Sequence, residues 1–296
     1  MLRNHIRYTD GATAAVTDRG LRHQRNEDAV AIGSLPGGGS IMVVCDGVSS
    51  TAGAAAASLV AADTIRDVLL ERLGRGGRIG IAVALIEAAE LAQSLVGAMP
   101  EVGQDSPYPQ SGPPSSTIAA AVAVPDGDST EVTVAWLGDS RVYWIGDCGS
   151  RLLTEDHQVR GRLTRWLGSD SPDPRPDLLR YELAGQGRLV ACSDGLWRYS
   201  PSSKALGRLV NTLVPSDPPA RHLPPKPQRS KARLGASDLR AAPAIRSART
   251  MNGAGRSSST SRGRTMVEIA EGLVNHAVAR GGHDNISVAI WESPRG

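Results

Sequence analysis

Short apolar runs alternate with clusters of Gly, Pro, Asp and Ser along most of the chain, a pattern typical of β-strands joined by tight turns. Eight of these runs are predicted to be strands: 13–17, 29–33, 41–45, 117–124, 131–137, 141–145, 188–192 and 286–291. Several are separated only by turn residues, as at 125–128 and 138–140. Connections this short favour antiparallel hairpins over parallel strands joined by helical crossovers.

Three longer segments carry apolar residues at a spacing of three and four, the period of an amphipathic helix. They cover residues 53–73, 81–95 and 265–279. Helices that stand apart from runs of strands indicate an α+β domain with mainly antiparallel sheet.

The segment 214–264 differs in composition from the rest of the chain. It contains 11 basic and two acidic residues, a net charge of +9 where the whole chain carries +3. It also contains seven prolines and shows no sustained period. We therefore predict one domain over residues 1–296, interrupted by a basic, disordered insertion at about 214–264. Such a segment could contact an acidic partner, although a solvated loop without a partner is the simpler interpretation.

The composition excludes several classes of protein. Hydrophobic residues make up 40% of the 296 residues, enough for a sizeable core. No run approaches the roughly 18 consecutive apolar residues of a membrane-spanning helix, and no secretory signal is visible. The three cysteines form no Cys-x-x-Cys pair. These features predict a cytoplasmic protein without a disulfide framework or a zinc ribbon, in which Cys45 and Cys192 pack in the core.

Acidic residues stand at the ends of the predicted strands, several of them next to glycine. A single Asp-Gly at a strand end is usually just a turn, but five such positions occur here: Glu27-Asp28, Asp46, Asp139, Asp194 and Asp284. If the strand ends align, these carboxylates converge and repel one another unless cations bind. Oxygen ligands without Cys or His spacing indicate Mg²⁺ or Mn²⁺ rather than zinc.

The order of these motifs resembles the protein phosphatase 2C family, the metal-dependent (PPM) protein serine/threonine phosphatases. The resemblance covers residues 13 to about 200 and 265–291. It rests on Thr17-Asp18-Arg19-Gly20, Asn26-Glu27-Asp28, Cys45-Asp46-Gly47, Ser116-Thr117, Gly138-Asp139-Ser140, Thr154-Glu155-Asp156-His157, Ser193-Asp194-Gly195 and Gly282-His283-Asp284-Asn285. It implies a four-layer α-β-β-α sandwich of two mainly antiparallel sheets flanked by helices, which agrees with the α+β pattern.

The resemblance also implies a centre of two Mn²⁺ or Mg²⁺ ions, with a third, weaker site in bacterial members. By position, Asp46 would bridge the two ions and the Gly47 carbonyl would bind one of them. Asp194 and Asp284 would complete the first ion's ligands. Glu27 and Asp28 would hold the second ion, and Asp139 would contribute to the third. The catalytic set is thus Asp46, Asp194 and Asp284.

The implied activity is hydrolysis of phosphoserine and phosphothreonine in proteins by a metal-bridged hydroxide. Phosphorylated proteins would be the substrates, and a serine/threonine kinase is the implied counterpart. The family usually has an arginine where this chain has His23, with Arg22 and Arg25 nearby. These three residues are the candidates for binding the substrate phosphate.

Three other interpretations are open. The fold could serve as a pseudophosphatase, a catalytically weak regulatory binding module, although clustered carboxylates are costly to keep without cations. The site could hydrolyse small phosphate esters. The basic segment could instead carry the function, by binding nucleic acid or an acidic protein. It lacks the aromatic residues that stack on bases, so nucleic acid is not an expected partner.

Overall fold

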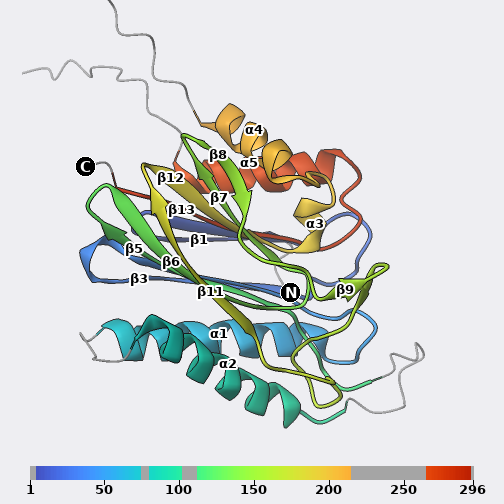
Figure 1. Ribbon diagram of the computed structural model, residues 1–296. Coiled ribbons are helices and arrows are strands. Elements are labelled where there is room, and N and C mark those ends of the chain that lie inside the picture. The colour runs from blue at the N-terminus through green and yellow to red at the C-terminus, as the bar shows by residue number, and fades with distance from the viewer. Residues whose placement is uncertain (1–4, 75–79, 102–111, 215–264, 295–296) are drawn as a thin grey trace, which may run out of the picture. The chain divides into compact units, whose positions relative to one another are not determined.

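Two antiparallel sheets form the centre of the structure, a computed structural model that describes residues 5–74, 80–101, 112–214 and 265–294 (Figure 1). One sheet has the strand order β1-β2-β13-β12-β7-β8 and the other β11-β6-β5-β4-β3. The strands of the first are β1 (His5–Asp10), β2 (Thr13–Asp18), β13 (Ile286–Glu292), β12 (Gly187–Cys192), β7 (Arg141–Gly146) and β8 (Gly149–Leu152). Those of the second are β11 (Asp177–Ala184), β6 (Ser129–Leu137), β5 (Ile118–Asp126), β4 (Ser40–Asp46) and β3 (Asp28–Ser34).

Helices cover the outer face of each sheet. On the five-stranded sheet lie α1 (Ala54–Gly74), which contacts β3 and β4, and α2 (Ile81–Gly97), which packs on α1. On the six-stranded sheet lie α4 (Ser203–Leu213) and α5 (Met266–Ala279), while α3 (Asp194–Trp197) is a single turn after β12. The four layers confirm the predicted α-β-β-α sandwich of mainly antiparallel sheets. The remaining elements are a short helix η1 (Pro36–Gly38) and the small hairpin β9 (Gln158–Val159) and β10 (Arg162–Leu163).

The core fills the spaces between these layers. Strand β4 is apolar throughout because both of its faces are buried: Met42 and Val44 face the other sheet, whereas Val43 and Cys45 face the helices. The chain has no Phe, and tryptophans supply the bulk between the sheets. The helices approach the sheet closely because small residues line their inner faces. The buried tryptophans and helix alanines are Trp136, Trp144, Trp291, Ala57, Ala61, Ala88 and Ala92.

The eight predicted strands and three predicted helices are present, with ends that differ by a few residues at most. Strands β1, β8 and β11 and helix α4 were not predicted. Strand β11 lies at a sheet edge and most of its side chains are exposed, so its sequence lacks the alternation of a half-buried strand. Helix α4 buries only Leu206, Gly207 and Val210, and Ser202 caps its first turn.

The predicted basic insertion lies outside the described residues apart from Val214, so the prediction of a single interrupted domain stays a prediction. Residues 1–214 and 264–296 belong to one unit. Within the described ranges, no helix combines the length and apolar character needed to cross a membrane. Cys45 and Cys192 are buried and unpaired, and Cys148 is exposed.

Candidate metal centre

Strand pairing places two of the predicted ligands face to face. Asp28 begins β3, Asp46 ends β4, and the antiparallel register makes them direct partners. Thr117, just before β5, holds Asp46 from both sides: Thr117 Oγ1 accepts from the Asp46 amide at 3.0 Å, and the Thr117 amide donates to the Asp46 carbonyl at 2.8 Å. The backbone of Asp46 is therefore fixed before any ligand binds.

The six-stranded sheet brings two further acids to the same end of the sandwich. Asp194 lies two residues after the end of β12 at Cys192, and Asp284 lies two residues before β13. Ser193 connects the two sheets, because its hydroxyl donates to Asp28 Oδ2 at 2.8 Å and accepts from the Ser287 amide at 3.0 Å. The hydrogen bond from Ser193 to Asp28 thus holds the two sheets together at the site, in addition to the packing of the core.

Asn285 fastens the loop that precedes β3. Its side-chain oxygen accepts from the Glu27 amide at 2.7 Å, and its Nδ2 donates to the carbonyls of Arg19 at 2.8 Å and Arg25 at 3.0 Å. Gly20 lies in the same loop with φ of 70°, and a Cβ there would be 2.1 Å from the Asp284 carbonyl oxygen. Only glycine accepts both this conformation and this close approach.

Four of the predicted acids line one cavity of about 160 Å³. They are Asp46, Asp139, Asp194 and Asp284, and the other lining residues are Gly47, Val48, Ser49, Thr117, Gly161, Leu163 and Arg198. Asp28 is buried beside Asp46. Glu27 does not line the cavity, but its carbonyl accepts from the Gly47 amide at 3.1 Å. Five of the six sequence-predicted acids, all except Glu27, are thus brought together at one end of the two sheets.

The electrostatics of the cavity favour a cation. Burial, followed by repulsion from Asp28 and the other acids, raises the pKa of Asp46 well above its usual value. Burial and the charge of Asp284 raise the pKa of Asp28 to about 7 and that of Asp194 to about 8. Burial and the charge of Asp156 raise the pKa of Asp139 to about 6. A divalent ion would lower all of these pKa values, because it stabilises the ionised carboxylates.

The donor set suits a hard divalent ion. Carboxylate oxygens and a backbone carbonyl are ligands of Mg²⁺ and Mn²⁺. Asp194 Oδ1 is buried and has no hydrogen-bond partner in the described part of the chain, which a buried carboxylate oxygen rarely lacks. Among the described residues, no three Asp, Glu, His or Cys side chains lie close enough together to hold a metal ion as they stand, although four of the acids line the same cavity. The residues fit a metal centre by the chemistry of their donor atoms.

The predicted phosphate-binding residues lie at the edge of this site. His23 Nε2 is 3.1 Å from Asp284 Oδ1, so its ring is engaged by a predicted metal ligand. Arg22 and Arg25 are exposed and are not among the cavity-lining residues.

Sequence reasoning missed Arg198, whose Nη2 is 2.6 Å from Asp194 Oδ2. The signal was available, because residues four apart on a helix share one face. Cys192 and Arg198 also have the Cys-x5-Arg spacing of cysteine-dependent phosphatases. However, Cys192 is fully buried and burial raises its thiol pKa, so it cannot serve as a thiolate nucleophile.

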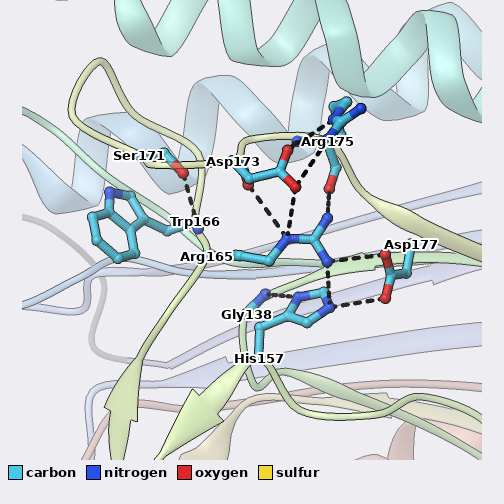
Figure 2. Close-up of polar contacts among 8 residues, drawn as sticks. All are labelled: Gly138, His157, Arg165, Trp166, Ser171, Asp173, Arg175 and Asp177. Atoms are coloured by element: carbon cyan, nitrogen blue, oxygen red, sulfur yellow. Dashed lines mark hydrogen bonds and ion pairs between the residues drawn. The ribbon is translucent and has the colours of Figure 1, made fainter.

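The segment from His157 to Asp177 is tied to the strands that carry the site (Figure 2). Gly138 donates its amide to His157 Nδ1 at 3.1 Å, and His157 Nε2 lies 3.0 Å from Asp177 Oδ2. Arg165 Nη1 reaches Asp177 Oδ1 at 2.9 Å. Gly138 precedes Asp139, which lines the cavity, so the contacts of His157 help to hold the loop that carries Asp139.

Comparison with known proteins identifies the family. A family model described as protein phosphatase 2C matches residues 19–224. The serine/threonine phosphatase stp of Listeria monocytogenes serotype 4b (strain F2365) is 26% identical over 213 residues, which is 64% of this chain and 79% of that protein.

Solved structures share the fold. The catalytic domain of the serine threonine protein phosphatase PstP, in complex with two manganese ions, has a TM-score of 0.59 and 19% identity, covering 95% of this chain and 98% of that one. The serine/threonine phosphatase Stp1 from Staphylococcus aureus has a TM-score of 0.61 and 18% identity, covering 97% and 96%. The family match confirms both the resemblance found in the sequence and the expected enzyme class, a protein phosphatase: the chain belongs to the protein phosphatase 2C family.

Proposed function

We propose that the protein is a metal-dependent protein serine/threonine phosphatase that hydrolyses phosphoserine and phosphothreonine in protein substrates. One observation carries the proposal: four carboxylates from separate parts of the chain line a single cavity, and an oxygen of one of them, Asp194 Oδ1, is buried without a hydrogen-bond partner among the described residues. Ionised carboxylates this close together repel one another, and bound cations offset that repulsion. Family membership and the named relatives support the same activity.

The ions proposed are two Mn²⁺ or Mg²⁺. Asp46 would bridge them, with the Gly47 carbonyl, Asp194 and Asp284 as further ligands. Glu27 and Asp28 would hold the second ion, and Asp139 would contribute to a third, weaker site. When bound, these ions supply a hydroxide nucleophile near neutral pH and neutralise charge on the phosphoryl oxygens. The manganese-bound structure of PstP supports the choice of metal by analogy.

The chain's own residues hold this centre in place. Thr117, Ser193 and Asn285 fix the backbone and carboxylates through the hydrogen bonds described above. Substrate phosphate would be bound from the loop that carries Arg22, His23 and Arg25. His23 needs to leave Asp284 to do so, since its Nε2 is engaged there.

The expected setting follows from the activity. Phosphorylated proteins would be the partners, a serine/threonine kinase would supply them, and the protein would work in the cytoplasm. The basic segment 214–264, with its net charge of +9, would contact an acidic partner if it contacts any.

A second candidate function is a catalytically weak pseudophosphatase that binds and regulates. It is favoured by two internal ion pairs, because Arg198 engages Asp194 and His23 engages Asp284. Cations supplied by the chain can partly replace metal ions in balancing the carboxylates.

A phosphopeptide assay separates the two functions. The full chain is assayed with a phosphothreonine peptide and with p-nitrophenyl phosphate, each with Mn²⁺ and with EDTA. The phosphatase proposal expects Mn²⁺-dependent peptide hydrolysis that Asp46→Asn and Asp194→Asn reduce by about a thousandfold or more. Activity that ignores EDTA would refute the metal mechanism. Mn²⁺ binding without turnover would favour the pseudophosphatase, and turnover of p-nitrophenyl phosphate alone would point to small phosphate esters.

A further inference from the structure

The cavity contains one basic side chain among the described residues that line it. Arg198 stands with Asp46, Asp139, Asp194 and Asp284 around the same space. Its side chain is 55% exposed, whereas that of Asp194 is 10% exposed. A guanidinium that is both in the cavity wall and open to solvent can meet an incoming anion directly.

Arg198 is held in position by its neighbours. Its Nη2 pairs with Asp194 Oδ2 at 2.6 Å, and its guanidinium carbon lies 5.8 Å from the ring centre of Trp197. Trp197 is itself fixed, because its indole N–H donates to the Asp139 carbonyl at 2.9 Å and Arg141 stacks 3.7 Å from its ring centre. The side chain therefore has little freedom to lose when it binds a ligand.

The ion pair leaves part of the guanidinium free to act. An arginine has five N–H donors in a planar fork, and the pair with Asp194 is made through Nη2. The fork geometry matches the oxygens of a phosphoryl group, which arginine binds through two parallel hydrogen bonds. The pair also divides the carboxylate of Asp194: Oδ2 meets Arg198, while the buried Oδ1 stays available for a divalent ion.

The other candidate cations are less well placed. His23 is engaged by Asp284, and neither Arg22 nor Arg25 lines the cavity.

We propose that Arg198 is a substrate-binding residue, whose guanidinium contacts the phosphoryl group of the phosphoserine or phosphothreonine substrate at the mouth of the cavity. This inference rests on the proposed phosphatase function, since it names the group that recognises the phosphate in that same site. It assigns the phosphate contact to the helical turn that follows Asp194, rather than only to the loop before β3.

The test compares Arg198→Gln and Arg198→Lys with the wild type in the full, Mn²⁺-loaded chain. Arg180→Gln is the matched control, because Arg180, on β11, is an exposed arginine that pairs with Glu131 on β6 and is not among the cavity-lining residues. Three quantities are measured: KM and kcat for a phosphothreonine peptide, the affinity for inorganic phosphate by calorimetry, and the number and affinity of bound Mn²⁺ ions. Circular dichroism checks that each variant is folded.

We expect Arg198→Gln to raise KM and weaken phosphate binding by roughly tenfold or more, the effect of losing a charge-assisted hydrogen bond. Mn²⁺ stoichiometry should not change, Arg198→Lys should recover part of the phosphate affinity, and Arg180→Gln should behave as wild type. Unchanged KM and phosphate affinity in Arg198→Gln would overturn the proposal. So would a change confined to Mn²⁺ affinity, which would make Arg198 a charge partner of Asp194 only.

The phosphate measurement separates this inference from the proposed function. If the wild type hydrolyses no phosphopeptide, the phosphatase proposal fails. Calorimetry with inorganic phosphate still decides whether Arg198 binds a phosphoryl anion, because that readout needs no turnover.

Discussion

Asp28 lies directly opposite Asp46 where β3 pairs with β4, so two carboxylates face each other across adjacent strands. Like charges in such a position destabilise a sheet. Here Asp28 is buried and Asp46 half-buried, and the charges of Asp194 and Asp284 add to the repulsion. This destabilising arrangement lies at the end of the sandwich where we propose the metal centre.

The first prediction concerns the pH dependence of stability without metal. Burial and neighbouring charges raise the pKa of Asp139 to about 6, Asp28 to about 7 and Asp194 to about 8. Each carboxyl then holds its proton more tightly in the folded chain than in the unfolded one. Raising the pH removes protons that the folded state binds better, so stability falls from about pH 4 up through these pKa values.

Thermal unfolding in EDTA at pH 5 and pH 8.5 measures this effect. We expect the melting temperature to be lower at pH 8.5 by about 3 °C or more, the shift for about 1 kcal/mol in a domain of this size. Mn²⁺ should abolish or reverse the difference, because it binds the ionised carboxylates. Asp46→Asn should reduce the slope in EDTA. A metal-free protein that is equally stable at both pH values would contradict the raised pKa values.

The second prediction concerns Ser193, the hydroxyl that joins the two sheets. Ser193→Ala removes the hydrogen bond to Asp28 and leaves the buried Ser287 amide without this acceptor. The loss of a buried partner costs about 1–3 kcal/mol. We expect a lower free energy of unfolding in urea and weaker Mn²⁺ binding, since Asp28 is no longer oriented. Ser129→Ala, at an exposed hydroxyl on β6, is the control and should change neither quantity.

Apolar period and turn residues predicted the strands, the helices and the α+β class, because they report burial directly, whereas the layered sandwich was implied by the family resemblance. The runs at 41–45 and 286–291 and the helix at 81–95 bury whole faces, so their patterns are strong. Strand β11 and helix α4 bury few residues and left weak patterns. Local pattern is a reliable guide only where an element is mostly inside.

For the site, the acids next to strand ends could be predicted, and the four-residue spacing also indicated the contact of Arg198 with Asp194. The contacts of His23 with Asp284 and of Ser193 with Asp28 could not be predicted, because they join distant parts of the chain and depend on side-chain direction. A family resemblance cannot predict side-chain contacts at a position where the residue type differs from the family pattern, as at His23.

The sequence of the basic segment 214–264 reports its composition only, so the role of this segment stays a prediction.

The third prediction concerns Asn285, which is 2% exposed and binds three backbone groups of the loop before β3. Asn285→Ala leaves the Glu27 amide and the carbonyls of Arg19 and Arg25 without these partners. We expect a loss of about 2 kcal/mol or more in the free energy of unfolding. We also expect weaker Mn²⁺ binding, while the helix content measured by circular dichroism stays close to that of the wild type. Asn211→Ala, at an exposed position of α4, is the control. Wild-type Mn²⁺ affinity in Asn285→Ala would show that the loop does not position the metal ligands.

The last prediction concerns His157, which links Gly138 to Asp177. Nδ1 accepts from the Gly138 amide, and Nε2 lies 3.0 Å from Asp177 Oδ2 and 2.9 Å from Arg165 Nη1. His157→Ala breaks both links, whereas Asp177→Ala breaks only the outer one. Hydrogen exchange should therefore be about 10- to 100-fold faster at Gly138 in His157→Ala, as expected for about 1–3 kcal/mol of local stability.

Asp177→Ala should accelerate exchange around Arg165 and leave Gly138 close to wild type. Phosphopeptide turnover should fall more in His157→Ala than in Asp177→Ala, since Gly138 precedes the cavity-lining Asp139. Equal exchange rates at Gly138 in both variants would mean that the His157 imidazole does not hold the loop that carries Gly138 and Asp139. In that case the backbone bond from the His157 amide to the Gly138 carbonyl, at 2.8 Å, would hold the loop by itself.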